Sequence, residues 1–451
     1  MSVEFRIRDF GYPVAILRLR DQFERSQWWS LDRLVAYQEQ RLRQVVEHAY
    51  HHVPYYRDLF RSLKLVPADV RTLSHLDKLP RLSKATVRRE FDRLQARTGK
   101  PSRSHVYSTT GTTGEPVHFL LDKSANVLEF VHYWRHWSWA GYRLGRRFAE
   151  FSSDHFLRRA ELAEQPWRYQ RGLGRLLLNS IALTPERVDQ CTGALRKYRP
   201  GFLKGLASVL YAFARLLEER RTTDLTFSGI FSTGESLLPM QRSVIERVFR
   251  TKVYDSYGHM ERTVAITECR SGGLHIHPEY GVLELVHGAS GEGTAGILGT
   301  SLHNFSMPLL RYEVGDLVET SSSPSPCACG RAMPRVQRII GRQEDVITTP
   351  DGRVVTTLFL VFNHVAGIAL GQAVQDAPDH LIVTIARSEH YTRHSEADLR
   401  RGVRQFVGPT VRVEIKYVSL DELRPSPGAK FRSVISHVRS GTGSPGTPTG
   451  A

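Results

Sequence analysis

The residues best suited to chemistry are concentrated between Tyr107 and Pro116, where the chain reads Tyr-Ser-Thr-Thr-Gly-Thr-Thr-Gly-Glu-Pro. Glycine lets backbone N–H groups approach an anion closely, and the Ser and Thr hydroxyls add further donors, so the segment is a candidate phosphate-binding loop. It is not a Walker A loop, because Glu115 stands where that motif has lysine. The alternative is an ordinary Ser/Thr/Gly-rich surface turn.

The elements that would position further polar loops lie between residues 200 and 255. Apolar runs at 202–205, 227–231 and 252–255 alternate with helical patterns at 207–221 and 239–249. This β-α-β-α-β alternation predicts a mostly parallel sheet that binds ligands at the carboxyl ends of its strands. We expect the loops at 109–115, 232–235 and 256–261 to lie at such ends and to converge on one crevice.

The flanking segments predict the rest of the architecture. Apolar residues recur at helical spacing from 27 to 62, and Ser83 is a candidate N-cap for a helix at 85–95. An aromatic-rich helix is expected at 128–140; its rings either pack in the core or wall an apolar substrate site. Short β runs follow residue 281, namely 282–286, 296–302, 309–312 and 317–321, and a hairpin is expected at Asp351 and Gly352.

Composition sets outer limits on the function. A chain of 451 residues is too long for one ordinary core, so two or three domains are expected, and 41% hydrophobic with 24% charged residues is typical of a globular protein. The net charge is +16, with 52 arginines against 10 lysines. The arginines are scattered over every segment of the chain. We therefore attribute the positive charge to a codon-bias background and to attraction of anionic ligands, and not to a nucleic-acid-binding surface.

Nothing in the chain predicts secretion or a membrane span. The first residues lack a basic segment followed by an apolar one, so no signal peptide is expected. The most apolar window, 357–374, contains Asn363, His364 and Gln372, which favours a buried helix and strand. Four cysteines do not form a disulfide framework. We therefore expect a cytoplasmic protein.

Several segments together resemble the adenylate-forming superfamily of acyl-CoA synthetases, in particular its phenylacetate-coenzyme A ligase branch. The resemblance spans most of the chain: residues 48–57 and 76–80 resemble the opening of that branch, 108–116 its phosphate loop, 232–235 its adenine loop, 255–261 its Tyr-Gly-x-x-Glu motif, 311–316 its ribose motif, 341–345 its hinge and 428–432 its catalytic lysine motif.

The resemblance implies an α/β fold of the adenylate-forming type. A large N-terminal domain, residues 1–341, would have mostly parallel sheets and a β-rich subdomain, and would bind ATP and the carboxylate. A small mobile catalytic α/β domain would occupy residues 342–439. Residues 440–451, which are only Gly, Ser, Thr, Pro and Ala, are expected to be a disordered tail.

The resemblance also implies roles for individual residues. Glu261 would hold Mg²⁺, Asp255 would face the adenine amino group with Tyr257 stacked on the ring, and Asp316 would accept both ribose hydroxyls. Lys430 would reach the carboxylate and the α-phosphate from the mobile domain. The residues expected to act in catalysis are Lys430, Glu261 and Thr109. The residues expected to bind the nucleotide are Ser108, Thr110, Gly111, Thr112, Thr113, Gly114, Gly234, Glu235, Asp255, Ser256, Tyr257, Gly258, Asp316 and Arg342.

Structural alternatives exist for each of these residues. The Asp and Tyr after a strand could form a turn and a core contact, Gly315 with Asp316 could be an ordinary β-turn, and Lys430 could be a solvated lysine. Three departures from the family pattern also stand out. They are Glu115 in the phosphate loop, His259-Met260 before the glutamate, and Glu344 in the hinge.

Two short clusters suggest a metal site. Cys269-x₅-His275-x-His277 and Cys327-x-Cys329-Gly330 supply thiolate and imidazole ligands, which suit tetrahedral zinc. Related ligases imply a structural site of Cys269, His275, Cys327 and Cys329. His277 is expected to point to the other face of a strand. The alternative is buried free thiols and core histidines. Cys191 is expected in the core.

The predicted function is ATP-dependent activation of a carboxylic acid, aryl or otherwise apolar, as an acyl-adenylate. Transfer to coenzyme A would then release AMP, with ATP, Mg²⁺ and coenzyme A as cofactors and structural Zn²⁺ as a further candidate. One alternative acceptor is a carrier-protein pantetheine or an amine. Alternatives of other kinds are a basic nucleic-acid-binding protein and an ATP-binding scaffold without turnover. No nucleic-acid or membrane partner is expected, and a homodimer is left open.

Overall fold

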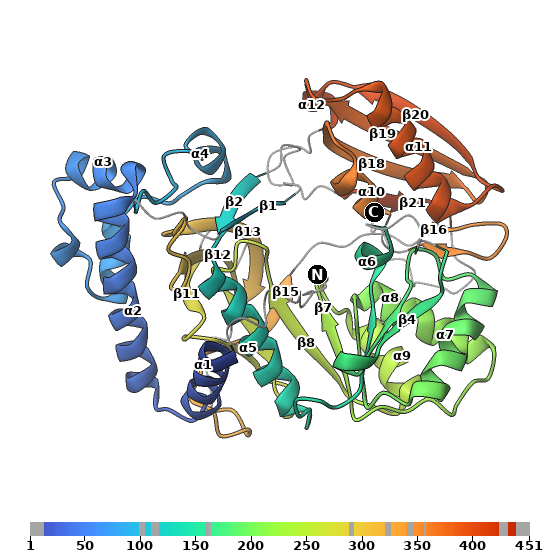
Figure 1. Cartoon of the computed structure of the whole chain (residues 1–451), viewed down its shortest axis with the longest axis horizontal. Coiled ribbons are helices and arrows are strands. Elements are labelled where there is room, and N and C mark those ends of the chain that lie inside the picture. The colour runs from blue at the N-terminus through green and yellow to red at the C-terminus, as the bar shows by residue number, and fades with distance from the viewer. Residues whose placement is uncertain are drawn as a thin grey trace, which may run out of the picture.

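The structure is a computed structural model. It describes residues 13–98, 104–109, 117–157, 162, 164–287, 293–320, 326–340, 347–355, 358–423 and 432–438. The N-terminal helices are α1 (Pro13–Ser26), α2 (Leu31–His52) and α3 (Pro54–Ser62). Figure 1 shows α2 and α3 at the left of the molecule, in blue. Ser30 caps α2 by accepting the N–H of Arg33, and the buried face of α2 carries apolar residues at helical spacing, as predicted.

The next helix is shorter than the sequence predicts. Two 3₁₀ turns, η2 (Pro67–Asp69) and η3 (Leu73–Lys78), precede α4 (Lys84–Arg89). Ser83 caps α4 as expected, accepting the N–H of Thr86 at 3.1 Å. The predicted helix at 85–95 is wrong beyond Arg89, because the carbonyl of Arg93 accepts the N–H of Tyr55 at 3.0 Å instead of continuing the helix.

A nine-stranded sheet in the order β14-β10-β9-β8-β7-β6-β3-β5-β4 forms the centre of the molecule. Strands β5, β3, β6, β7 and β8 run parallel to one another, which confirms the parallel pattern predicted for 202–255. Strands β4 and β9 flank this group and are antiparallel to it. The bounds are β3 (Phe148–Phe151), β4 (Trp167–Gln170), β5 (Arg175–Leu178), β6 (Phe202–Gly205), β7 (Gly229–Thr233), β8 (Val253–Gly258), β9 (Ala265–Glu268), β10 (Leu274–Ile276) and β14 (Arg335–Val336).

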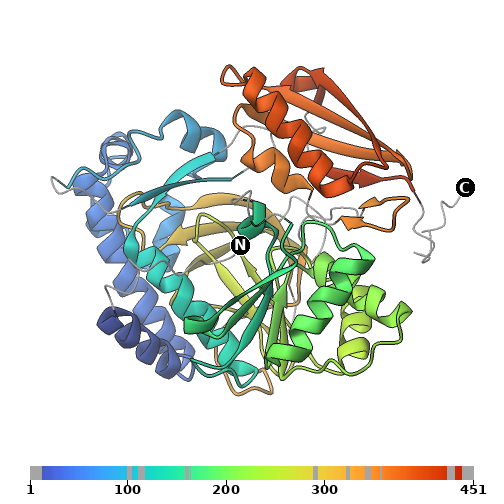
Figure 2. The same cartoon turned by 45° about the vertical axis from the view of Figure 1, so that its right-hand side comes forward.

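Helices cover both faces of this sheet. Residues of α7 (Pro185–Tyr198), α8 (Ala207–Glu219) and α9 (Pro239–Phe249) share one apolar cluster with β3 and β5–β8. They are the green helices at the lower right of Figure 2. On the other face, α5 (Lys123–Trp139) packs against α1 and against aromatic rings of the sheet. Asp122 caps α5 and starts it earlier than the predicted residue 128. The short elements α6 (Ser153–Leu157) and η5 (Arg171–Leu173) link the strands.

Two smaller sheets complete this part of the chain. Strands β1 (His105–Thr109) and β2 (Val117–Leu121) form an antiparallel pair. The prediction that residues 109–115 follow a strand of the parallel sheet is therefore wrong. A four-stranded sheet contains β11 (Gly281–His287), β12 (Thr294–Ser301), β13 (Tyr312–Glu319) and β15 (Arg338–Ile340). The strand predicted at 309–312 is absent from the described chain, because Arg311 has a φ of 53° and Leu310 donates to the Tyr56 hydroxyl.

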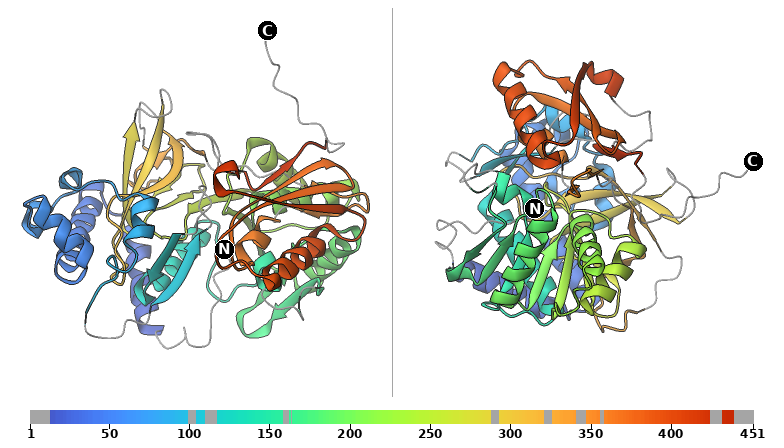
Figure 3. Two further views of the ribbon diagram at one scale, coloured as in Figure 1. Left: turned by 90° about the horizontal axis from the view of Figure 1, so that it is seen from above. Right: turned by 90° about the vertical axis from the view of Figure 1, so that its right-hand side faces the viewer.

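The C-terminal elements form a separate sheet, β20-β19-β18-β21, with a hairpin beside it. Figure 3 shows these elements in orange and red over the green part of the chain in both views. Phe156, Leu177 and Ile181 pack there against Leu358 and its neighbours. The elements are β16 (Ile347–Thr348), β17 (Val354–Val355), α10 (Phe359–His364), β18 (Ile368–Ala377), β19 (His380–Arg387), α11 (Arg393–Val407), β20 (Arg412–Val418), α12 (Leu420–Leu423) and β21 (Val434–Ser436).

The hairpin predicted at Asp351 and Gly352 is β16–β17, and the window 357–374 forms a helix and a strand, as expected. The predicted tail at 440–451 lies outside the described residues. Every helix in the described chain is too short or too polar to cross a lipid bilayer.

Two glycines allow the four-stranded sheet to approach the end of β8. Thr263 is fully buried, and a Cβ at Gly281 would lie 1.8 Å from its carbonyl oxygen. A Cβ at Gly299 would lie 1.8 Å from the Thr263 hydroxyl oxygen. We expect Gly299→Ala to lower the free energy of unfolding by about 1–3 kcal/mol or more, because such overpacking forces the backbone apart.

Urea denaturation measures this effect. Gly193→Ala is the matched control, because Gly193 is an exposed residue of α7 with no heavy atom within 4 Å of the added Cβ. It should raise stability by up to about 1 kcal/mol, the helix preference of alanine over glycine. Equal changes in the free energy of unfolding for the two variants would contradict the proposed close contact.

Candidate active site

The pairing of β7 with β8 brings two of the predicted loops together. Ser232 lies opposite Asp255, and Thr233 lies opposite Ser256. The turn after β7 passes through Gly234, which has a φ of 78°, and a Cβ there would lie 2.8 Å from the Leu206 side chain. The carboxylate of Glu235 accepts the N–H and the hydroxyl of Ser208 at 2.9 and 3.0 Å. Glu235 thus anchors this turn to the first turn of α8.

Asp255 is a buried carboxyl group in the middle of this arrangement. Its Oδ1 accepts the N–H of Ser256 at 3.0 Å, and its own N–H donates to Glu268 at 3.1 Å. Burial, followed by the nearby charge of Glu268, raises the pKa of Asp255 from the ordinary 3.8 to about 7. The carboxyl group can therefore donate or accept a hydrogen bond near neutral pH.

Glu261 lies in a pocket of hydrogen-bond donors. The Tyr312 hydroxyl donates to its Oε1 at 2.6 Å, and His259 Nδ1 lies 3.0 Å from its Oε2. Burial alone would raise the pKa of Glu261, but His259, the Tyr312 hydroxyl and the charge of Lys84 lower it to about 2. An ionised carboxylate is therefore present throughout the neutral range. This is the form that binds a hard divalent cation.

The same contacts explain the unusual His259 before this glutamate. His259 Nε2 lies 3.1 Å from the Thr263 hydroxyl, so both ring nitrogens are used between Glu261 and the buried Thr263. Sequence reasoning missed Tyr312 and Lys84 as neighbours of Glu261. The only available signal for Lys84 was that lysine is rare in this arginine-rich chain.

A hydrogen bond joins the two sheets at the predicted nucleotide residues. The Tyr257 hydroxyl at the end of β8 donates to Asp316 Oδ2 of β13 at 2.8 Å. Both side chains are half-buried. Tyr257 and Asp316 are thus neighbours in space although 59 residues separate them in the chain.

The remaining predicted residues are only partly described. Ser108, opposite His118 in the β1–β2 pair, is exposed, and Thr109 ends β1. Outside the described residues lie Thr110, Gly111, Thr112, Thr113, Gly114, Glu115, Arg342, Glu344 and Lys430. Their roles stay predictions.

The Cys and His residues predicted to bind zinc form one cluster. The ligand atoms of Cys269, His275, Cys327 and Cys329 all lie within 4.8 Å of one another. The Sγ atoms of Cys269 and Cys327 are 3.6 Å apart, and Cys329 Sγ lies 3.3 Å from His275 Nε2. His275 Nδ1 lies 3.2 Å from the Met333 carbonyl oxygen, which leaves Nε2 facing the thiols.

Three observations fit a metal at this cluster. The separations of 3.3 Å between Cys329 Sγ and His275 Nε2 and of 3.6 Å between the Sγ atoms of Cys269 and Cys327 match those around a tetrahedral ion with bonds of about 2.0–2.3 Å. Burial lowers the pKa of His275 to about 4, so its imidazole is neutral at pH 7. A Cβ at Gly273 would lie 2.8 Å from Cys327 Sγ and 3.2 Å from His275 Nε2, so only glycine leaves this space open.

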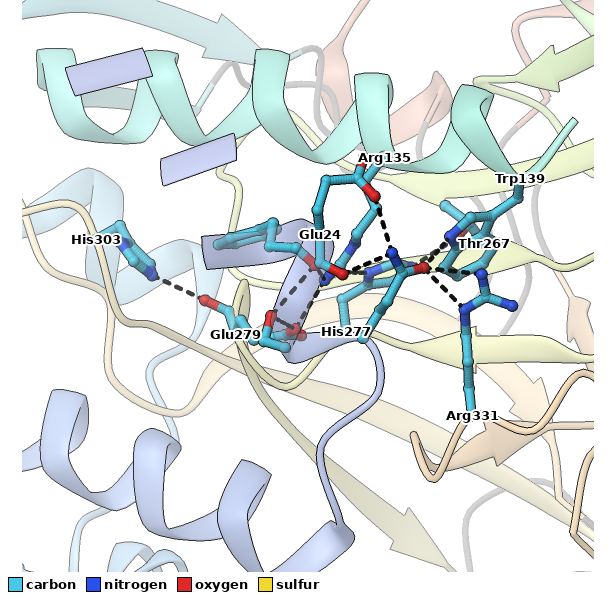
Figure 4. Close-up of polar contacts among 11 residues, drawn as sticks. Glu24, Arg135, Trp139, Thr267, His277, Glu279, His303 and Arg331 are labelled. Atoms are coloured by element: carbon cyan, nitrogen blue, oxygen red, sulfur yellow. Dashed lines mark hydrogen bonds and ion pairs between the residues drawn. The ribbon is translucent and has the colours of Figure 1, made fainter. Parts of the chain in front are cut away.

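His277 belongs to a different cluster, shown in Figure 4. Arg135 donates to its Nδ1, and its Nε2 lies 2.6 Å from the Thr267 hydroxyl. Arg135 also pairs with Glu279 at 2.7 Å, and both side chains are fully buried. His277 is thus not among the clustered metal-ligand candidates, as predicted, but the predicted reason is wrong. Trp139 contacts the rings of both His275 and His277, so the two side chains do not point to opposite faces. The partners of its ring nitrogens keep His277 out of the cluster. Cys191 is buried in the apolar core, as predicted.

The aromatic helix α5 packs mainly in the core. Trp137 contacts Tyr142, Phe148 and Phe231, with ring centroids 4.6–5.9 Å apart. Tyr133 differs, because its hydroxyl lies 3.5 Å from Thr233 beside the Gly234 turn. Behind Tyr133, Lys204 lies 5.2 Å from the ring centroid and pairs with Glu150 at 3.2 Å. Tyr133 of α5, Lys204 of β6 and Glu150 of β3 therefore place aromatic and charged groups beside the turn.

Comparison with known proteins agrees with this geometry. No family model matches the chain. It is 24% identical over 418 residues to protein CapK of Staphylococcus aureus, covering 90% of each chain. It is 25% identical over 415 residues to phenylacetate-coenzyme A ligase of Escherichia coli K12, covering 87% of this chain and 84% of that one. The enzyme of that name from Thermus thermophilus is 25% identical over 329 residues, covering 70% and 72%.

Solved structures give the same answer for the fold. Structures of 2-hydroxyisobutyryl-CoA ligase with a bound acyl-adenylate superpose with TM-scores of 0.59 and 0.56 at 20% and 19% identity, covering 92% of this chain. The predicted adenylate-forming fold is thus confirmed. The relatives confirm the predicted resemblance to the phenylacetate-coenzyme A ligase branch and the predicted enzyme class, an AMP-forming acid–thiol ligase.

The raised pKa of Asp255 predicts a pH-dependent stability. Between pH 3.8 and about 7 the folded protein keeps a proton that the unfolded chain releases, so this group lowers stability as the pH rises through that window. Asp255→Asn removes the effect. We expect the variant to gain at least about 1 kcal/mol over the native protein between pH 4.5 and 7.5, as measured by urea denaturation.

Asp224→Asn is the control for this experiment. Asp224 is an exposed partner of Arg196, whose hydrogen bond lowers the pKa of the aspartate. The control should show no such gain with rising pH. If the difference in free energy of unfolding between Asp255→Asn and the native protein does not change with pH, Asp255 is ionised like an exposed carboxylate.

Proposed function

We propose that the chain activates a carboxylic acid with ATP and transfers the acyl group to coenzyme A. A carboxylate oxygen attacks the α-phosphorus of ATP and pyrophosphate leaves, forming an acyl-adenylate. The thiol sulfur then attacks the acyl carbon, loses its proton, and AMP leaves. The observation that carries the proposal is a pair of hydrogen bonds to β13: Tyr257, two residues after Asp255 on β8, donates to Asp316, and Tyr312 donates to the ionised Glu261. The resemblance to named ligases over most of the chain supports it.

The described residues suit the nucleotide half of this reaction. Asp316 would accept the ribose hydroxyls, and its bond from Tyr257 orients the carboxylate for that role. Tyr257 would face adenine with its ring, and Asp255 would lie near the amino group. Bound Mg²⁺ would neutralise phosphate charge, and Glu261 is the residue that would hold it. Catalysis would then be mainly positioning and charge neutralisation.

The phosphate loop, the hinge and Lys430 complete the proposal. Ser108 and Thr109, with Thr110, Gly111, Thr112, Thr113 and Gly114, would bind the β- and γ-phosphates. Arg342 would contact the nucleotide at the start of the hinge. We also propose that residues 1–341 and 342–439 act as two domains, and that rotation of the second domain brings Lys430 to the carboxylate.

For the acid we propose an aryl or otherwise apolar carboxylate. It would bind beside the Gly234 turn, where Tyr133 of α5 reaches Thr233. A second candidate is an acid with an additional polar group, since Lys204 and Glu150 lie directly behind Tyr133. Coenzyme A also has an alternative as the acceptor, because a carrier-protein pantetheine or an amine could receive the acyl group after the same activation step.

We propose that the Cys/His cluster binds one structural zinc ion. Its four candidate ligands are three sulfurs and one imidazole, a set typical of closed structural sites. The cluster lies where β9, β10 and the segment before β14 meet. A bound ion would hold residues 327–329 against the sheet edge.

The first experiment is ATP-to-AMP turnover with a panel of aryl, aliphatic, hydroxy and dicarboxylic acids, with and without coenzyme A. AMP release that requires both an acid and coenzyme A supports the proposal and identifies the acid class. Acid-dependent adenylate formation that does not increase with coenzyme A would indicate that the acceptor is a carrier protein or an amine. Salt-sensitive DNA binding with no turnover would favour the nucleic-acid alternative.

Lys430→Ala should reduce acid-dependent pyrophosphate release about 100-fold or more, the usual cost of losing a charge-stabilising group at a reacting centre. ATP binding, measured by calorimetry, should persist. Lys416→Ala is the matched control, since Lys416 is exposed and pairs only with Glu414, at 3.3 Å, among the described residues. Unchanged pyrophosphate release in Lys430→Ala would remove that residue from the mechanism.

Cys327→Ser should lower bound zinc from about one equivalent to about a tenth or less, because three ligands no longer close a tetrahedral site. Metal analysis of protein purified without a histidine tag measures this content. Cys191→Ser alters the cysteine outside the cluster and should keep the native zinc content. Less than about half an equivalent in the native protein would contradict the zinc proposal.

A further inference from the structure

A small pocket lies at the edge of the nine-stranded sheet opposite the candidate nucleotide site. Its volume is about 200 Å³, and its lining residues come from the loop before β3, the loop before β6 and the residue before β7. These are the amino ends of the parallel strands, whereas Thr233 and Gly234 follow at the carboxyl end of β7. The lining residues are Gly141, Arg146, Arg147, Arg199, Gly201, Phe202 and Ser228.

The pocket concentrates positive charge without compensation. Three of its lining residues are arginines and none is acidic. Within the described chain, Arg146 and Arg199 make no ion pair, and Arg147 donates only to the Tyr198 carbonyl oxygen, at 2.7 Å. Other arginines on this part of the sheet are paired; Arg175, for example, binds Glu150. The three guanidinium groups therefore retain most of their donors for a ligand.

The walls of the pocket are held in place before any ligand binds. The N–H of Gly201 donates to the Arg147 carbonyl at 3.1 Å, and the N–H of Ser228 donates to the Gly201 carbonyl at 2.7 Å. Arg199 ends α7 with a φ of 44°, and its N–H bonds the Leu195 carbonyl. The lining residue Phe202 packs against Tyr142 and Phe148. A pre-formed site lowers the ordering cost of binding.

We propose that this pocket binds a phosphate group, either as free phosphate or pyrophosphate or on a small phosphorylated molecule. Guanidinium groups match phosphate oxygens in geometry, and charge-assisted bonds of this kind are strong. A phosphate monoester carries about two negative charges, so it compensates three arginines better than one carboxylate does. The Ser228 hydroxyl provides a further donor. The site is separate from the nucleotide site and does not depend on the proposed ligase activity.

Calorimetry with the full chain tests the proposal, using inorganic phosphate, pyrophosphate and glycerol phosphate as probes. We expect one equivalent of the best probe to bind at submillimolar concentration, and the ranking of the probes to distinguish the free anions from an ester. The double variant Arg146→Gln/Arg199→Gln should bind that probe at least tenfold more weakly. Thr112→Val/Thr113→Val, which alters the predicted phosphate loop, should leave this binding unchanged.

The matched control is Arg143→Gln/Arg250→Gln. It removes the same charge from two exposed arginines outside the pocket; Arg250 ends α9 with a φ of 51°, much as Arg199 ends α7. Its affinity should stay within about threefold of the native value. Ser228→Glu places a carboxylate in the pocket and should also abolish binding, which keeps the test valid if the double variant does not fold.

Three results would overturn the proposal. They are no submillimolar binding of any probe to the native protein, equal losses in the pocket and control variants, and loss of binding in Thr112→Val/Thr113→Val. The last result would place the anion in the nucleotide site instead.

Discussion

The pairing of β8 with its two neighbours is the constraint on which the rest of the site depends. On one side, β7 places Ser232 opposite Asp255 and Thr233 opposite Ser256. On the other side, antiparallel β9 places Thr267 opposite Ser256 and leads directly to Cys269. A slip of one residue would turn every side chain of β8 to the opposite face. One strand therefore sets the position of both the candidate nucleotide residues and the Cys/His cluster.

Sequence predicted those parts of the molecule that local pattern controls. The alternation of apolar strands and amphipathic helices from 202 to 255 was enough for the parallel sheet, and Ser83 was enough for the start of α4, because both signals act over a few residues. The four candidate zinc ligands were chosen from the resemblance, and the structure brings them together. Residue type and order along the chain sufficed where the ligand set is short and chemically distinctive.

Sequence could not predict contacts that arise only when distant elements meet. The bond from Tyr257 to Asp316 joins two sheets, and Lys84 reaches Glu261 from a helix that precedes it by more than 170 residues. Local signals were also misleading in places. The apolar run at 309–312 has strand composition, but the bond from Leu310 to Tyr56 and the left-handed Arg311 prevent a ladder. His275 and His277 stand only two residues apart, and the contacts of His277 with Thr267 and with the distant Arg135 distinguish them.

Gly273 has a consequence for how this cluster can be recognised in other chains. A side chain at that position would occupy the space between Cys327 and His275, since even a Cβ would lie 2.8 Å from the sulfur. The cluster thus has five sequence requirements, four candidate ligands and one absent side chain. A related chain that keeps the cysteines and the histidine but carries a larger residue there would have lost the geometry while retaining the ligands. Inheritance of the cluster can therefore be followed through a position that supplies none of its candidate ligands.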